Sequence, residues 1–250
     1  MPKTGGSTIT RLWEDPTINS LRYQCTHCEL THEVLASSQR RTMGSAAWSK
    51  AVTFATVRNP FDWALSLFFY VIKQVCGGWQ VGHAQKHLNT TFIACEYQRL
   101  LQNAAGTERL GAVRRGAFNR WLVRHDWLAK SGRQRFLWPN ALAATLQQRP
   151  RKPTTQRAWL TDERGDEVLV KHVVRLEDAE YHRWASPAGL LSVLCNRTVT
   201  DTDIAEPPRL NMAPKSKRRS DHYTPRSCEI IARRFARDFT AFAYDPSDCP

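Results

Sequence analysis

The segment PKTGGST, residues 2–8, contains the residue types of an anion-binding loop. Its two consecutive glycines let backbone N–H groups turn inward, and the serine and threonine after them add hydroxyl donors ahead of an expected short helix. Backbone amides at a helix N-terminus bind phosphate through hydrogen bonds and the helix dipole. Lys3 precedes the glycines, whereas the Walker pattern places its lysine after the last glycine. The segment therefore favours a phosphate loop of another kind, and an ordinary N-terminal turn is the alternative.

A second pair of chemical groups follows the apolar segment 51–57. Arg58 comes directly after this segment, at the place where ligands bind in open α/β sheets. Ser66 lies one turn beyond Asp62 on the helix expected next. A guanidinium and a hydroxyl at this edge would suit one phosphate group. Taken singly, Arg58 is also compatible with a surface ion pair and Ser66 with an ordinary helix position.

The elements that must position these groups alternate between strand and helix. Residues 51–57 are nearly continuously apolar, as in a strand buried on both faces, and residues 167–176 predict a second strand. Asn59 as N-cap and Pro60 at the first helical position predict a helix to about Gln74. This order predicts an α/β fold with a central, mainly parallel sheet flanked by helices, in a single domain over residues 1–250. Further helices are expected near residues 34–48, 91–104, 116–128, 181–195 and 224–239.

Together these segments resemble the sulfotransferases that use 3′-phosphoadenosine-5′-phosphosulfate (PAPS), most closely the branch of carbohydrate O-sulfotransferases. The family's 5′-phosphosulfate loop reads PKTGG(T/S)(T/S), as residues 2–8 do, and its 3′-phosphate motif is matched by FATVRNPFDWALS at residues 54–66. The branch's Q-x-x-WL block appears at residues 156–160 and its R-x-E at residues 175–177. Its closing helix and aromatic tail resemble residues 223–244. The resemblance covers almost the whole chain in the family's order.

The resemblance implies a P-loop-like three-layer fold and transfer of a sulfuryl group from PAPS to an acceptor hydroxyl, with a carbohydrate as the expected acceptor. Lys3 would lie by the bridging oxygen and neutralise charge on the departing phosphate, and Arg58 and Ser66 would hold the 3′-phosphate. In-line positioning and charge stabilisation carry such a transfer, so no metal is required. The cofactor's 5′-phosphate would be held by the loop residues Lys3, Thr4, Gly5, Gly6, Ser7 and Thr8.

An acceptor hydroxyl also needs a base to take its proton. In this branch a histidine commonly lies between the two phosphate motifs, and His32 stands in that place. The near-neutral pKa of histidine suits the task. Glu33 and His27 are the alternatives, and a purely structural role for His32 stays open.

The seven cysteines do not define a disulfide framework, and their odd number leaves at least one unpaired within the chain. Cys25 and Cys28, with His27 and His32, are of metal-ligating types. One C-x-x-C without a second pair at suitable spacing is a weak zinc signal, so we expect no metal site.

The chain carries 36 lysines and arginines against 23 acidic residues, a net charge of +13, and should attract polyanions. The basic stretches 149–157 and 215–219 fit solvated loops or contacts with an anionic acceptor, and Trp79 and Trp138 are candidates for stacking on a sugar. Nucleic acid is not expected as a partner. Two other function classes stay open: a basic nucleic-acid- or polyanion-binding protein without catalysis, and another P-loop-type nucleotide enzyme.

Two features bear on location. The longest nearly apolar run, residues 63–72, is about half the length of a bilayer-spanning helix, so no transmembrane segment is expected. Family members have a buried strand before the phosphate loop, and here the loop begins at residue 2, so we expect the first strand to be missing or truncated. The expected compartment is the cytoplasm for the chain as it stands, or the Golgi membrane or lumen if an N-terminal anchor has been lost.

Overall fold

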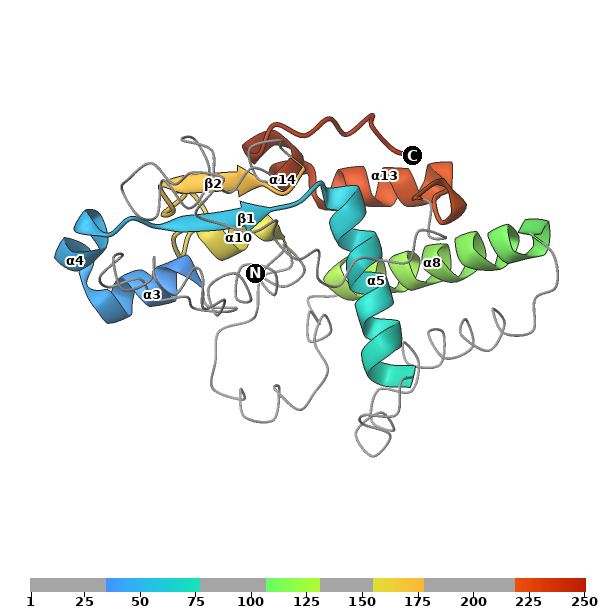
Figure 1. The fold of residues 1–250 in the computed structure, drawn as a ribbon, viewed down its shortest axis with the longest axis horizontal. Coiled ribbons are helices and arrows are strands. Elements are labelled where there is room, and N and C mark those ends of the chain that lie inside the picture. The colour runs from blue at the N-terminus through green and yellow to red at the C-terminus, as the bar shows by residue number, and fades with distance from the viewer. Residues whose placement is uncertain (1–34, 77–106, 131–154, 178–218) are drawn as a thin grey trace, which may run out of the picture. The chain divides into compact units, whose positions relative to one another are not determined.

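The computed structural model describes residues 35–76, 107–130, 155–177 and 219–250 of the chain (Figure 1). The chain divides into two compact units. Among the described residues, the first unit contains 35–59 and 155–177, and the second contains 60–76, 107–130 and 219–250. Across these ranges, no helix combines the length and the apolar character needed to cross a membrane. The single domain expected over residues 1–250 stays a prediction.

The first unit is built on two parallel strands, β1 (Phe54–Val57) and β2 (His172–Arg175) (Figure 1). Phe54 pairs with His172, and the register runs on to Val57 opposite Arg175. Helices together with a parallel strand pair make the chain a mixed α/β protein, as the sequence predicted.

The first strand is shorter than the expected 51–57 because the preceding helix reaches into that segment. The backbone N–H of Ala51 still donates to the carbonyl of Ala47, 3.0 Å away, at the end of α4 (Ser45–Lys50). The expected helix over 34–48 is also divided, into α3 (Ala36–Met43) and α4. Gly44 separates them with φ 81°, a left-handed conformation that glycine adopts at little cost.

The second strand is likewise shorter than the expected 167–176. The first part of that segment forms an antiparallel bridge between Thr161 and Val168, and the N–H of Leu169 donates to the carbonyl of Leu160 at 2.8 Å. Only the later part pairs with β1. The short helix α10 (Gln156–Leu160) precedes this bridge and is capped by the hydroxyl of Thr155, which accepts from the N–H of Ala158 at 3.3 Å.

The second unit contains α5 (Pro60–Cys76), α8 (Thr107–Lys130), the 3₁₀ turn η3 (Arg219–Asp221), α13 (Pro225–Arg234) and α14 (Ala236–Ala241) (Figure 1). Helix α13 packs against both α5 and α8. The core of the unit is mainly aromatic. Its buried aromatic side chains are Phe61, Trp63, Phe68, Phe118, Trp121, Tyr223, Phe235, Phe239, Phe242 and Tyr244.

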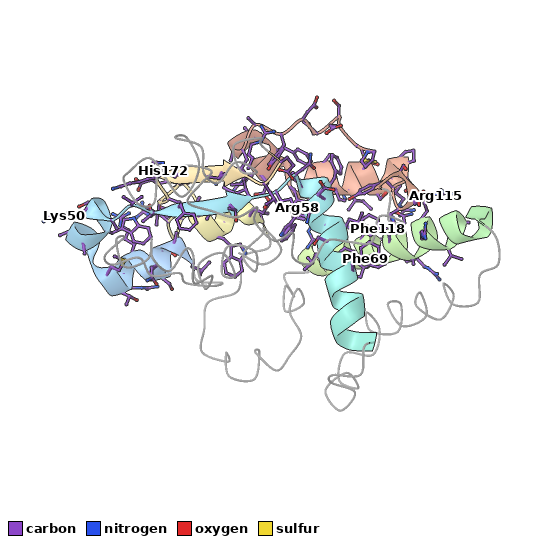
Figure 2. The ribbon with its side chains drawn as sticks, in the orientation of Figure 1. Lys50, Arg58, Phe69, Arg115, Phe118 and His172 are labelled. Carbon is purple, nitrogen blue, oxygen red and sulfur yellow. A yellow bond between two sulfur atoms is a disulfide. The ribbon has the colours of Figure 1, made fainter. Side chains whose placement is uncertain are left out.

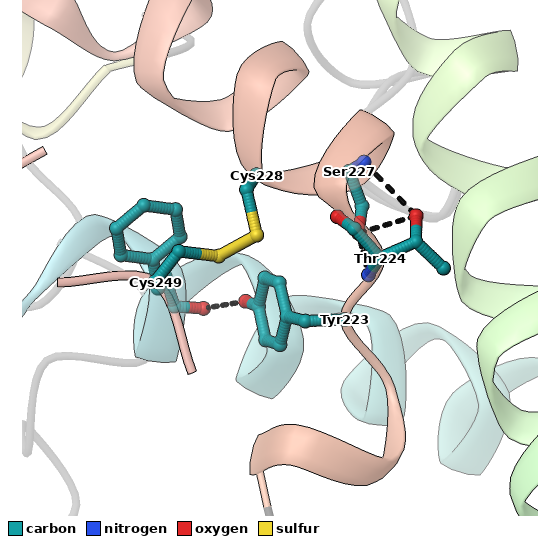
Figure 3. The surroundings of a disulfide bond; sticks show 6 residues. Tyr223, Thr224, Ser227, Cys228 and Cys249 are labelled. Atoms are coloured by element: carbon teal, nitrogen blue, oxygen red, sulfur yellow. Dashed lines mark hydrogen bonds between the residues drawn. A yellow bond between two sulfur atoms is a disulfide. The ribbon is translucent and has the colours of Figure 1, made fainter. Parts of the chain in front are cut away.

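The C-terminal helix begins as its sequence predicts but ends earlier. Thr224 and Ser227 form a reciprocal capping box, and Pro225 occupies the first helical position (Figure 3). The single helix expected over 224–239 is interrupted at Phe235, where α14 takes over. A disulfide joins Cys228 to Cys249 and ties the chain end to α13, a pairing that the cysteine pattern did not identify (Figure 3).

Candidate anion site at the carboxyl end of β1

Arg58 is the predicted site residue that the first unit places most clearly. It follows β1 directly, at the edge where the parallel strands end (Figure 2). The side chain is half-buried, and within the described parts of the chain no hydrogen bond or ion pair engages its guanidinium. A half-buried guanidinium can bind an oxyanion through two parallel N–H···O bonds. The edge therefore offers a cation suited to a phosphate.

The main chain around Arg58 is held by the side chain of Gln156, the first residue of α10. Gln156 is completely buried. Its Oε1 accepts from the N–H of Arg58 at 2.9 Å, and its Nε2 donates to the carbonyl of Arg58 at 2.7 Å. The side-chain amide thus pairs with Arg58 as a neighbouring strand would, beyond the point where the β1–β2 ladder ends.

Glu177 holds the next residue along the chain. Its Oε1 accepts from the N–H of Asn59, which is itself buried, at 2.8 Å. On the other side of Arg58, the carbonyl of Val57 accepts from the N–H of Leu176 at 2.8 Å. Both peptide groups that flank Arg58 therefore have their N–H and their carbonyl bonded. Buried peptide groups are costly to leave unpaired, so this turn has little freedom to rearrange.

The charges at this edge are mixed. Arg175, opposite Val57 in the register, is a second half-buried cation and already takes part in interactions within the structure. Glu177 adds one negative charge, which is directed to the backbone of Asn59. Of the two cations, Arg58 is the one that the described residues leave available to a ligand.

For the other predicted site residues, a common site with Arg58 stays a prediction. Ser66 lies on the second turn of α5 in the second unit and is half-buried. Its pairing with Arg58 in one phosphate site stays a prediction. The phosphate loop from Lys3 to Thr8 and the expected base His32, with its alternatives Glu33 and His27, lie outside the described residues. So do Cys25, Cys28, Trp79, Trp138 and the basic residues 149–154 and 215–218.

In the described ranges, no group of three or more His, Cys, Asp or Glu side chains is arranged to hold a metal ion. The groups that sequence reasoning missed are instead the backbone-bonding side chains of Gln156 and Glu177. The sequence contained their signal, because both residues belong to the blocks that resemble the family, but those blocks indicated fold rather than contact with the Arg58 turn.

Comparison of the chain with protein-family models, with curated proteins and with solved structures finds no match.

Proposed function

We propose that this chain is a sulfotransferase that moves the sulfuryl group of PAPS to an acceptor hydroxyl, with a carbohydrate as the acceptor. One observation carries the proposal: the guanidinium of Arg58 lies half-buried at the end of a parallel strand and is engaged by no described side chain. Both peptide groups that flank Arg58 are hydrogen-bonded. This residue is the arginine of the segment that resembles the 3′-phosphate motif. The following helix begins at Pro60, as that motif requires. The same proposal includes the finer fold, a P-loop-like three-layer fold in which helices flank a central, mainly parallel sheet.

The roles divide between the two phosphates of the nucleotide. Arg58 and Ser66 hold the 3′-phosphate, and the loop from Lys3 to Thr8 holds the 5′-phosphate. The acceptor oxygen attacks sulfur in line with the sulfur–oxygen bond to the 5′-phosphate, which breaks and releases adenosine 3′,5′-bisphosphate. His32 takes the acceptor's proton, and Lys3 balances the charge that grows on the leaving phosphate.

The proposal is tested by binding to adenosine 3′,5′-bisphosphate, measured by titration calorimetry. Arg58→Ala removes a charge-assisted contact worth roughly 1.5–3 kcal/mol, which corresponds to a loss of affinity of roughly 10- to 150-fold. Arg41→Ala is the matched control, because it removes the same charge from an exposed helix of the same unit. We expect the control to bind like the wild type. Equal affinity of the Arg58 variant and the control would refute the assignment.

Measurements of turnover distinguish the role of Lys3 from that of Arg58. Lys3→Ala should lower the rate of sulfuryl transfer more than the affinity for the bisphosphate, because the ammonium acts on charge that develops in the transition state. Labelled PAPS offered with glycans, phenols and peptides would identify the acceptor. An affinity loss in the Lys3 variant as large as its rate loss would contradict the role at the leaving group.

A basic polyanion-binding protein is the second candidate. It is favoured by the net charge of +13 and by the exposed arginines of α13 and α14. Elution from immobilised bisphosphate decides between the two. Selective elution by adenosine 3′,5′-bisphosphate over AMP supports the sulfotransferase, and equal elution by any polyanion supports the second candidate.

The compartment belongs to the proposal as well. Disulfides persist in oxidising compartments and are rare in the cytosol, so the Cys228–Cys249 bond supports a lumenal or extracellular location over the cytoplasm. Alkylation of free thiols in freshly extracted protein, followed by mass spectrometry of the C-terminal peptides, measures this directly. Finding both thiols free in the cell would count for the cytoplasm.

A further inference from the structure

We propose that Gln156 and Glu177 are positioning residues, which fix the direction of the Arg58 guanidinium toward its anionic ligand by bonding the main chain of Arg58 and Asn59. The inference rests on the proposed function, since it concerns the same site. It adds two residues that touch no ligand and act through Arg58.

The geometry supports a positioning role because a guanidinium on a flexible side chain is directed more precisely when its backbone is fixed. The polypeptide leaves β1 at Val57, and strand pairing ends with the bond from the N–H of Leu176. From there the bonds from Gln156 to Arg58 and from Glu177 to Asn59 replace the missing strand neighbour. A binding group loses affinity when its support lets it shift by about 1 Å.

The two residues contribute differently. Gln156 is completely buried and uses both ends of its amide, so it fixes the peptide plane on each side of Arg58. Glu177 is exposed overall, and its carboxylate accepts from the N–H of Asn59 without donating to the carbonyl side of the turn. A glutamine could do the same at position 177, whereas no other natural side chain of equal length supplies both a donor and an acceptor at position 156.

The experiment is a double-mutant cycle on the affinity for adenosine 3′,5′-bisphosphate, with AMP as the second probe. Gln156→Met keeps the approximate volume and removes both bonds. We expect it to weaken bisphosphate binding roughly tenfold and AMP binding hardly at all. In the Arg58→Ala background the same substitution should have no further effect, because the group through which it acts is gone.

A merely structural role predicts another pattern. General loosening of the fold would weaken AMP and bisphosphate alike, and its cost would be the same with or without Arg58. Either result would overturn the inference while leaving the proposed function standing. If Arg58→Ala itself leaves bisphosphate affinity unchanged, the proposed function and the inference both fail, so the two failures are distinguishable.

Glu177 provides the second arm, since an exposed side chain can be changed with less risk to folding. Glu177→Gln keeps an acceptor for the N–H of Asn59 and should retain bisphosphate affinity within about twofold, whereas Glu177→Ala should lose several-fold. Thermal unfolding of every variant verifies that it is folded at the assay temperature. Equal affinities of the Gln and Ala variants would overturn the assignment for Glu177.

Discussion

The two units of this protein are stabilised by different kinds of interaction. In the first unit, side chains are bonded to the backbone of distant segments: Gln156 and Glu177 hold the Arg58 turn, and the indole Nε1 of Trp48 donates to the carbonyl of Leu169 at 3.2 Å. In the second unit, aromatic rings pack on one another. The ring of Phe118, labelled in Figure 2, is one example. Its centroid lies 5.1–6.4 Å from the ring centroids of Phe68, Trp121, His222 and Tyr223.

The difference shows which interactions fix the direction of a side chain and which stabilise the fold. A hydrogen bond is directional and fixes the plane of a peptide group, so it determines where the next side chain starts. Aromatic packing removes a large apolar area from water but tolerates small shifts of its members. The candidate binding residue Arg58 lies in the unit with the directional bonds, whose main chain is fixed beside it.

The largest expected effect comes from the aromatic core of the second unit. Phe118→Ala should lower the free energy of unfolding by about 3–5 kcal/mol, because the side chain is completely buried and its removal leaves a cavity. Urea unfolding followed by tryptophan fluorescence measures the loss. Phe118→Leu, which keeps most of the volume, is the control and should cost about 1.5 kcal/mol or less. A loss of less than about 1.5 kcal/mol for Phe118→Ala as well would show that burial of this ring is not what stabilises the unit.

The next effect in size concerns the disulfide. Cys228 and Cys249 are 21 residues apart, and closing a loop of that length stabilises a fold by about 3 kcal/mol. Cys249→Ser should lose that amount, and a reducing agent should destabilise the wild type equally while leaving the variant unaffected. Asp248→Asn is the control for a change in the same exposed segment. A reductant that destabilises Cys249→Ser as much as the wild type would locate the sensitive bond elsewhere.

The sequence predicted those features that depend on neighbouring residues. It located β1 within a longer apolar segment, the start of α5 at Pro60 and the capped start of α13 after Thr224. These signals are local, since a proline at the first helical position or a capping hydroxyl acts within one helical turn. The class, mixed α/β, follows from the same signals.

The remaining features depend on partners far along the chain. Gln156 bonds to Arg58, 98 residues away, and Glu177 bonds to Asn59, 118 residues away. The residues next to Gln156 and Glu177 in the sequence do not indicate that these side chains bond to a distant backbone. The strands begin later than expected because residues at their predicted starts form other hydrogen bonds. The N–H of Ala51 bonds to the end of α4, and Val168 pairs with Thr161 in an antiparallel bridge. The odd cysteine count could not select Cys228 and Cys249 among seven.

The smallest expected effect concerns Asp162, in the turn that follows α10 in the first unit. Desolvation raises the pKa of the Asp162 carboxyl, but the backbone N–H groups of Asp166 and Glu167, which donate to its Oδ1 at 2.8 and 3.3 Å, outweigh this, and the pKa lies below its ordinary value of 3.8. A carboxylate with a lowered pKa in the folded state contributes stability above the ordinary pKa, and that contribution is lost as the pH falls through the lowered value.

Asp162→Asn should therefore be less stable than the wild type at neutral pH. The gap should begin to shrink below pH 3.8 and close once the pH has fallen through the lowered pKa of the folded wild-type carboxyl. Urea unfolding of both proteins across this pH range measures the gap. Asp166→Asn removes the same charge from the same turn and is the control, because its side chain is exposed and the bonds to Asp162 come from its backbone. A gap that stays constant down to the lowest pH would mean that the charged carboxylate does not hold the turn after α10. The contrast between the two units would then rest on the hydrogen bonds of the Arg58 turn.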